Sequence, residues 1–189
     1  MFPDDIRAYQ PKNEQEAADQ RLILTYLQRD PDTILTRENE IGHITSSGFI
    51  VNADASKVLF AHHNLYRVWA WTGGHADGEA DLLSVALREA REETGIVHIR
   101  PLSEEIASLD ILPVWGHWKR GRYVPSHQHL NVTYLLQADE SDPLTVRPDE
   151  NSRVGWLPAD RLLALTNEWQ MDGVYTKLLD RARLLLGLV

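Results

Sequence analysis

Three glutamates near the end of one predicted helix constrain this 189-residue chain more than any other feature. Residues 80–94 carry leucine and alanine at helical spacing, which predicts an amphipathic helix with one apolar face. Gly95 is expected to end this helix, because glycine adopts the left-handed conformation after a helix without strain. Glu89, Glu92 and Glu93 then stand at positions i, i+3 and i+4, so their carboxylates share one face. The expected apolar positions are Leu82, Leu83, Ala86, Leu87 and Ala90.

The carboxylate cluster indicates a metal site beside a phosphate site. Like charges one helical turn apart repel each other, and some take up protons unless a cation separates them. Mg²⁺ prefers oxygen ligands and shares its coordination shell with water and substrate phosphates. A glycine-rich loop, residues 73–79, leads into the helix and allows close approach of the backbone. The alternative interpretation of the glutamates alone is a solvated acidic helix end.

The same stretch resembles the Nudix box, G-x5-E-x7-R-E-U-x-E-E-x-G-U, in which U is an aliphatic residue. The matching positions are Gly74, Arg88, Glu89, Glu92, Glu93, Gly95 and Ile96, with Ala90 at the first aliphatic position. The first glutamate departs from the pattern. The pattern places it at position 80, which is Ala80, and Glu79 lies one residue early.

The resemblance implies an αβα sandwich, a mixed β-sheet between helices, in which Nudix-like enzymes hydrolyse a nucleoside diphosphate linked to another group. It implies Mg²⁺ or Mn²⁺ held by Glu89, Glu92 and Glu93, with Arg88 orienting the glutamates. Within the box, Glu92 is our choice of general base. The loop residues Asp149 and Glu150 are the alternatives. The predicted substrate-binding residues are Gly74, His75, Glu79, His127 and His129.

Histidines recur in the clearest strand after the box, residues 127–138. Period two places His127 and His129 on one face, continued by Asn131 and Thr133. This pair, together with the loop sequence Gly-Gly-His-Ala-Asp-Gly around His75, resembles one group of Nudix hydrolases. We expect these histidines to line a cleft. Two histidines at this spacing can bind a metal or a phosphate, or each can alter the charge of the other. Structural roles alone are expected for the other histidines considered, His43, His98 and His117.

The remaining pattern is a mixture of helices and strands. Residues 1–40 are expected to be a helical extension packed on the domain formed by residues 41–189, either covering the sheet or helping to form a homodimer. Its helix, residues 12–29, has Asn13 and Glu16 in a capping arrangement, with Leu22 among its apolar positions. Strands are predicted at 41–51, 57–63, 106–118, 127–138 and 154–157, the last with Trp156 buried, and helices at 158–165 and 171–186.

Two further features carry alternatives. Trp69 and Trp71 share one side of an extended segment, and core packing is favoured there over stacking on a base. Residues 119–122 are the densest basic cluster. A solvated hairpin tip is favoured there over a guide for polyphosphates.

Composition narrows the class of protein. The formal charge of −9 disfavours bulk attraction for nucleic acid, so a small molecule is the expected partner. No apolar run approaches the 18 residues that suggest a membrane span, and residues 1–5 lack the features of a signal peptide. The absence of cysteine excludes disulfides and thiol catalysis and fits a cytoplasmic protein.

Three hypotheses follow. The first is a metal-dependent hydrolase of a nucleotide-type diphosphate. The second is an isomerase of isoprenyl diphosphates on the same fold, whose chemistry uses a cysteine that this chain lacks. The third is a non-catalytic module that binds nucleotide diphosphates, which the displacement of the first glutamate to Glu79 leaves open.

Overall fold

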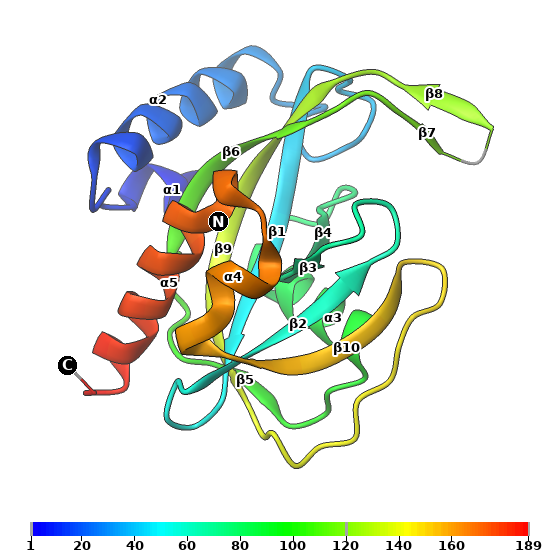
Figure 1. Cartoon of the computed structure of the whole chain (residues 1–189). Coiled ribbons are helices and arrows are strands. Elements are labelled where there is room, and N and C mark those ends of the chain that lie inside the picture. The colour runs from blue at the N-terminus through cyan, green and yellow to red at the C-terminus, as the bar shows by residue number, and fades with distance from the viewer. Residues whose placement is uncertain (1, 120, 189) are drawn as a thin grey trace.

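The computed structural model of this chain describes residues 2–119 and 121–188, so Arg120 of the predicted basic cluster lies outside the described residues. Figure 1 shows the elements in order. The helices are α1 (Phe2–Ala8), α2 (Glu14–Arg29), α3 (Leu82–Thr94), α4 (Leu162–Thr166) and α5 (Asp172–Leu185), with short 3₁₀ turns at Ala159–Arg161 and Trp169–Met171. The strands are β1 (Gly42–Val51), β2 (Lys57–His63), β3 (Trp69–Ala70), β4 (Thr72–His75), β5 (Ile99–Pro101), β6 (Ser108–Val114), β7 (His117–Lys119), β8 (Arg122–Val124), β9 (His127–Ala138) and β10 (Asn151–Pro158).

The main sheet is mixed. Its strand order is β10-β2-β1-β9-β5, with β3 paired to β2, β4 to β1 and β6 to β9. β1 and β9 run parallel at its centre from Gly42 opposite Gln128 to Val51 opposite Gln137, and the other pairs are antiparallel. Every residue of β1 is buried. β7 and β8 form a separate hairpin that projects from the molecule (Figure 1).

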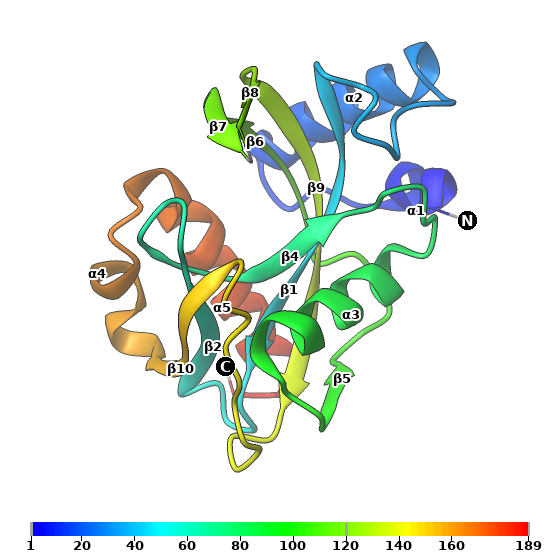
Figure 2. The same ribbon diagram turned by 90° about the vertical axis from the view of Figure 1, so that its right-hand side faces the viewer.

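Helices cover both faces of this sheet, which confirms the predicted αβα sandwich. Figure 2 shows α3 on one side and α4 and α5 on the other. The first apolar core joins α1, α2 and α3 to the sheet through residues such as Ile23, Leu82 and Leu130. The second joins α4 and α5 to the opposite face through residues such as Phe49 and Leu178.

The predicted box helix is confirmed as α3. Asp81 caps its start by accepting a hydrogen bond from the backbone N–H of Ser84 at 3.1 Å. Gly95 ends it with φ of 74°, in the left-handed region where a side chain is strained. Leu82 is buried as expected, whereas Leu83 and Leu87 only pack against the edge of the core.

The N-terminal prediction is correct for α2 but missed α1. Asn13 caps α2 by accepting a hydrogen bond from the backbone N–H of Glu16 at 2.8 Å. Leu22 was expected to be buried and is 47% exposed, because the neighbouring Ile23 takes the inward position. Helix α1 is only 7 residues long, too short for its periodicity to stand out.

Two strand predictions need correction. Residues 106–118 form β6 and β7 rather than one strand, because strand pairing is interrupted at Trp115 and Gly116, where the Gly116 N–H donates to Ser126 Oγ at 2.9 Å. Pro113 is tolerated in β6 because β6 pairs only with β9. Trp156 is half-buried rather than buried, since its strand β10 lies at the edge of the sheet.

A buried ion network ties α2 to β6 and α5. Glu16 is fully buried and pairs with Arg181 at 2.6 Å and Lys177 at 3.0 Å. Lys177 also pairs with buried Asp110 of β6 at 2.6 Å. Burial raises the pKa of Glu16. Hydrogen bonds from Arg181, the backbone N–H of Lys12, Tyr9 and Lys177 outweigh this effect and lower the pKa to about 2. The extension is therefore fastened to the sheet by charge as well as by apolar packing.

Replacing Glu16 with glutamine should destabilise the protein by about 3 kcal/mol at pH 7, because it leaves the largely buried guanidinium of Arg181 without its carboxylate partner. The pKa of Glu16 is lower in the folded chain, about 2, than its ordinary value of 4.5. Its stabilisation is therefore present above pH 4.5 and is lost as the pH falls through 2. Urea unfolding at pH 7 and at pH 3 measures this. Glu14→Gln, at an exposed position of the same helix, is the control, and an equal effect of both variants would contradict the account.

Candidate active site

Glu93 is the most buried of the three glutamates. Its side chain lies 7% exposed against β4, where Oε1 accepts a hydrogen bond from the backbone N–H of Gly73 at 3.0 Å. Burial raises the pKa of Glu93 to about 8; the Gly73 N–H opposes this shift, and the charges of Glu89 and Glu150 add to it. A carboxylate held in this way gains from a neighbouring cation.

Glu89 occupies the space above Gly74. A Cβ at position 74 would lie 2.5 Å from Glu89 Cδ and 2.8 Å from both carboxylate oxygens, closer than a side chain permits. Burial raises the pKa of Glu89, while Arg88 lowers it. Arg88 donates to Glu89 Oε1 at 3.0 Å and lies 3.9 Å from Glu92 Oε1, which fits its predicted orienting role.

Glu92 is more exposed and meets a residue that the sequence analysis missed. Arg147, from the loop before β10, pairs with Glu92 at 2.8 Å and with Glu150 at 3.2 Å. One arginine thus joins the two candidate bases, the box residue Glu92 and the loop residue Glu150. At the start of β10, Asn151 donates to the backbone carbonyl of Glu93 at 2.9 Å. No local pattern in the sequence signals either contact.

In the described part of the chain, Glu79 forms no ion pair with Arg88, so Arg88 does not link it to the glutamates of α3. Its carboxylate accepts a hydrogen bond from the backbone N–H of Asp81 at 2.9 Å, just before α3. Within the described part of the chain, the ion pairs of Arg88 are those with Glu89 and Glu92. The glutamate one residue early therefore supports the loop at the start of the helix.

The histidine cluster consists of His43, His75, His127 and His129. These residues come from β1, β4 and β9, and the parallel register places His43 directly opposite His129. Ring centroids lie 5.3 Å apart for this pair, 5.1 Å for His43 and His75, and 4.9 Å for His75 and His129. His127 lies 5.0 Å from His43 and 5.2 Å from His129. The sheet thus brings together the three predicted histidines and adds His43, for which only a structural role was expected.

His43, His75 and His129 are held in the neutral form. Burial is the largest cause for each: it lowers the pKa of His43, that of His75 to about 3 and that of His129 to about 2. His43 Nε2 and His129 Nε2 are buried and have no hydrogen-bond partner among the described residues. An unsatisfied buried polar atom costs about 1–3 kcal/mol. Neutral imidazoles with free lone pairs suit a cation better than a phosphate.

A hydrogen-bonded polar strip continues from the cluster along the same sheet face. Thr45 and Ser47 donate to Asn131 Oδ1 at 2.9 and 2.8 Å, and Asn131 donates to Thr133 at 2.9 Å. The predicted polar face of β9 is therefore satisfied within the sheet.

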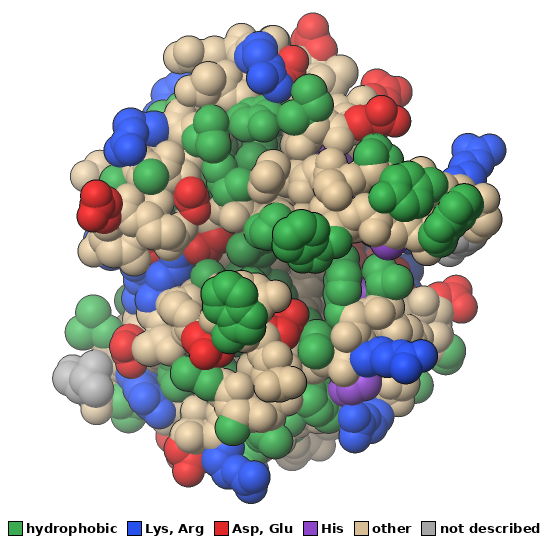
Figure 3. Space-filling view, turned by 45° about the horizontal axis from the view of Figure 1, so that its top comes forward, with side chains coloured by type: hydrophobic (Ala, Val, Ile, Leu, Met, Phe, Trp, Pro, Cys, Tyr) green, Lys and Arg blue, Asp and Glu red, His purple; other side chains and the backbone are tan. Residues whose placement is uncertain are grey.

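The two tryptophans before the glycine-rich loop are half-buried, and the described residues of the basic cluster are exposed. Trp69 and Trp71 pack against the second core, which confirms the prediction of core packing. The described part of the basic cluster forms the exposed tip of the β7–β8 hairpin, also as favoured. In Figure 3 this hairpin carries hydrophobic side chains, and others gather around a hollow beside it. The exposed hairpin aromatics are Trp118 and Tyr123.

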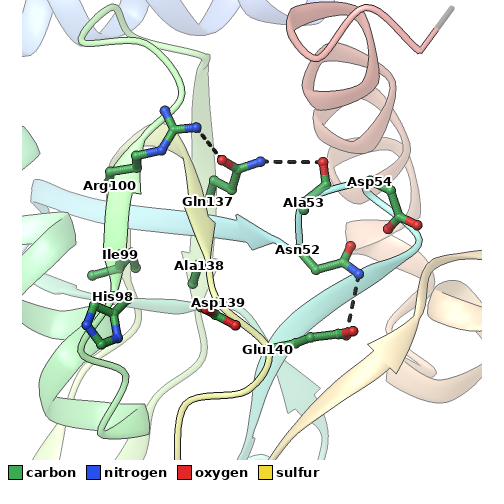
Figure 4. Close-up of a pocket in the computed structure, with 10 residues that line it drawn as sticks. All are labelled: Asn52, Ala53, Asp54, His98, Ile99, Arg100, Gln137, Ala138, Asp139 and Glu140. Atoms are coloured by element: carbon green, nitrogen blue, oxygen red, sulfur yellow. Dashed lines mark hydrogen bonds between the residues drawn. The ribbon is translucent and has the colours of Figure 1, made fainter.

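Two pockets among the described residues are lined without the glutamates of α3. One, of about 640 Å³, is lined by residues 52–54, 98–100 and 137–140 (Figure 4). Its polar groups bond one another: Arg100 donates to Gln137, and Asn52 to Glu140 at 3.4 Å. It lies at the far end of β1 from His43. A second, of about 470 Å³, has His127 in its wall.

Two groups of side chains are therefore candidates for holding cations. The glutamates and Glu150 are oxygen donors. In addition to burial, the charges of Glu92 and Glu150 raise the pKa of Glu89, and those of Glu89 and Glu150 raise the pKa of Glu93. In residues 2–119 and 121–188, the one set of three histidine or carboxylate residues with donor atoms within 4.8 Å of one another is His43, His75 and His129. Over the same residues, no helix has the length and apolar character needed to cross a membrane.

Without divalent cations, the stability of the protein should fall as the pH rises from 4.5 to 8. Glu93 holds its proton up to a pKa of about 8 in the folded chain, compared with its ordinary value of 4.5, so ionisation opposes folding across that window. Glu93→Gln should remove this dependence, worth on the order of a few kcal/mol. Urea unfolding in EDTA at pH 5 and pH 9 tests it. Glu92→Gln is the control, and an unchanged pH dependence in Glu93→Gln would refute the burial argument.

Comparison with known proteins identifies the fold. The described fold resembles that of a C. elegans Ap4A hydrolase at 17% sequence identity and a TM-score of 0.52, covering 71% of this chain and 93% of that one. It resembles a NUDIX family hydrolase from Clostridium perfringens at 25% identity and a TM-score of 0.52, covering 74% and 97%. The E. coli dihydroneopterin triphosphate pyrophosphohydrolase gives 16% identity and a TM-score of 0.54, covering 74% and 96%.

A search of curated protein sequences gives no match. The family model described as the NUDIX domain matches residues 42–178, which include the main sheet, α3 and the first half of α5. The glutamate helix, the glycine-rich strand beside it and the described strands of the main sheet lie within this match. The chain therefore belongs to the Nudix family.

Proposed function

We propose that this protein is a hydrolase that cleaves a diphosphate linkage in a small nucleotide-type substrate and depends on Mg²⁺ or Mn²⁺. The observation that carries the proposal is the placement of Glu89 and Glu93 against Gly73 and Gly74 of β4. Carboxylates are brought together where the backbone can approach phosphate closely, and their raised pKa values reflect burial and mutual repulsion.

These residues fit a hard divalent cation. Glu89, Glu92 and Glu93 would hold it, and their oxygens are the donors that Mg²⁺ prefers. When bound, such an ion neutralises charge that grows on the phosphoryl oxygens and makes a neighbouring water more acidic. Cytoplasmic location and a possible homodimer remain expectations from the sequence.

The chain's own residues supply positioning and proton transfer. Arg88 orients Glu89 through its 3.0 Å hydrogen bond. Glu92 is proposed as the general base, since its side chain is 43% exposed and open to water. Glu150 is the alternative base, and Arg147 contacts both. Gly74, His75, Glu79, His127 and His129 remain the proposed substrate-binding residues.

Membership of the Nudix family and the names of the relatives support a nucleotide-type substrate as the proposal. Those relatives include an Ap4A hydrolase and a dihydroneopterin triphosphate pyrophosphohydrolase, so dinucleoside polyphosphates and pterin triphosphates belong among the compounds to test. Exposed Trp118 and Tyr123 offer rings on which a base can stack.

Phosphate release, coupled to a phosphatase, tests the proposal. The substrates are nucleoside triphosphates, dinucleoside polyphosphates, nucleotide sugars, ADP-ribose and dihydroneopterin triphosphate, each with Mg²⁺, Mn²⁺ or EDTA. We expect metal-dependent release from one class. Glu93→Gln should lower kcat/KM by at least about 100-fold, because it removes charge needed at the reacting centre. Exposed Glu104→Gln is the matched control and should leave the rate unchanged.

The same assay separates the alternatives. A larger loss of kcat in Glu92→Gln than in Glu150→Gln supports the box residue as base, and the reverse supports the loop residue. Absence of turnover on every compound, with nucleotide binding retained, would overturn the hydrolase proposal in favour of a non-catalytic binding module.

Gly74→Ala should abolish most of the activity without unfolding the protein. The added Cβ would lie 2.5 Å from Glu89 Cδ, so the flexible end of Glu89 must move away. We expect kcat to fall by at least about tenfold, as misplacement of a catalytic group does, while Tm changes by only a few degrees. Activity equal to wild type would show that the position of Glu89 is not critical.

A further inference from the structure

The histidine cluster carries an inference independent of the glutamates. His43 is 4% exposed, and Nε2 of His43 and Nε2 of His129 are buried without a hydrogen-bond partner among the described residues. Donor atoms of His43, His75 and His129 converge within 4.8 Å of one another. Such convergence of unpartnered nitrogens is unusual in a packed interior, where buried polar atoms are almost always bonded.

The backbone fixes which nitrogen of two rings is free. His43 Nδ1 lies 2.9 Å from the carbonyl oxygen of Asn39, and His127 Nδ1 lies 2.9 Å from that of Pro125. A carbonyl oxygen only accepts, so each Nδ1 carries the proton and donates it. In a neutral imidazole with that proton on Nδ1, Nε2 is left with a lone pair. Histidines that bind metals are oriented in this way by a second hydrogen bond to a carbonyl or carboxylate.

The spacing needs only a small contraction to form a coordination shell. Tetrahedral Zn²⁺ binds histidine nitrogen at about 2.0–2.1 Å, which places neighbouring nitrogens roughly 3.4 Å apart. The donor atoms lie up to 4.8 Å apart, so rotation of the rings by about an ångström at the nitrogen closes the shell. His127, with its ring 5.0 Å from that of His43, is next to the three as a fourth donor.

The donor type selects the class of ion. Imidazole nitrogen suits Zn²⁺, Co²⁺, Ni²⁺ and Cu²⁺, whereas Mg²⁺ and Ca²⁺ prefer oxygen. The cluster offers imidazole nitrogens from four histidines, and its core of His43, His75 and His129 contains no carboxylate. The glutamates of α3 offer carboxylate oxygens as donors instead of nitrogens. The two groups therefore differ in the ions they favour.

We propose that His43, His75 and His129, completed by His127, form a binding site for a divalent transition-metal ion such as Zn²⁺, separate from the glutamate site. The sheet builds this site from three strands, and its free Nε2 atoms and carbonyl-anchored rings prepare it for the ion.

Titration of the metal-free full chain with Co²⁺ tests the proposal. We expect one equivalent to bind with the intense visible bands of tetrahedral Co²⁺, and Zn²⁺ but not excess Mg²⁺ to remove them. His129→Ala should weaken binding by at least about 100-fold, since a ligand to the ion is lost. His98→Ala, an exposed histidine elsewhere, should bind like wild type.

The glutamate variant separates the two sites. Glu93→Gln should keep the Co²⁺ bands, because the proposed ligands are all histidines. The proposal is overturned if wild type gives no tetrahedral bands, if His129→Ala keeps them, or if Glu93→Gln loses them. His75→Asn, at a half-buried position, provides a second ligand variant should His129→Ala fail to fold by circular dichroism.

Discussion

The pairing of β4 with β1 is the contact on which both groups of side chains depend. Its register sets Gly74 opposite Ser46 and His75 opposite Thr45. Successive residues of a strand point to opposite faces of the sheet. Gly74 therefore leaves room on the α3 side for Glu89, and His75 turns to the other side, where it meets His43. β4 thus lies between a carboxylate donor, Glu89, on one face and the imidazole donors His75 and His43 on the other.

The surrounding structure holds this strand in place from both sides. α3 packs its apolar face on the sheet and presents Glu93 to the backbone of β4. β9, the strand that carries His129, pairs with β6. Asp110 of β6 pairs with Lys177 of α5, and Lys177 also pairs with Glu16 of α2. Helix α2 therefore contributes to the rigidity of the sheet, although it lies far in sequence from the glutamates of α3.

The local part of this arrangement could be predicted from the sequence. The spacing of Glu89, Glu92 and Glu93 and the stop at Gly95 depend only on neighbouring residues, and the helix forms as expected. The shared face of His127 and His129 follows from period two in the same way. These short-range patterns also supported the resemblance to the family that the comparisons identify.

The long-range part could not be predicted. His43 was expected to be structural, because nothing near it in sequence reveals that β1 pairs in parallel with β9 and sets it opposite His129. Arg147 reaches Glu92 from a loop without regular structure, whose path depends on tertiary packing. Contacts between distant segments are determined by the register of the sheet, and a single sequence does not encode that register in a readable pattern.

The central claim is that β4 separates a site for hard cations from a site for softer ones. Crystals grown with both Mn²⁺ and Zn²⁺ test this directly, through anomalous difference maps measured at the absorption edge of each metal. The account predicts a manganese peak beside Glu89 and Glu93 and a zinc peak among His43, His75 and His129. A single shared position for both metals, or no zinc peak among the histidines, would contradict it.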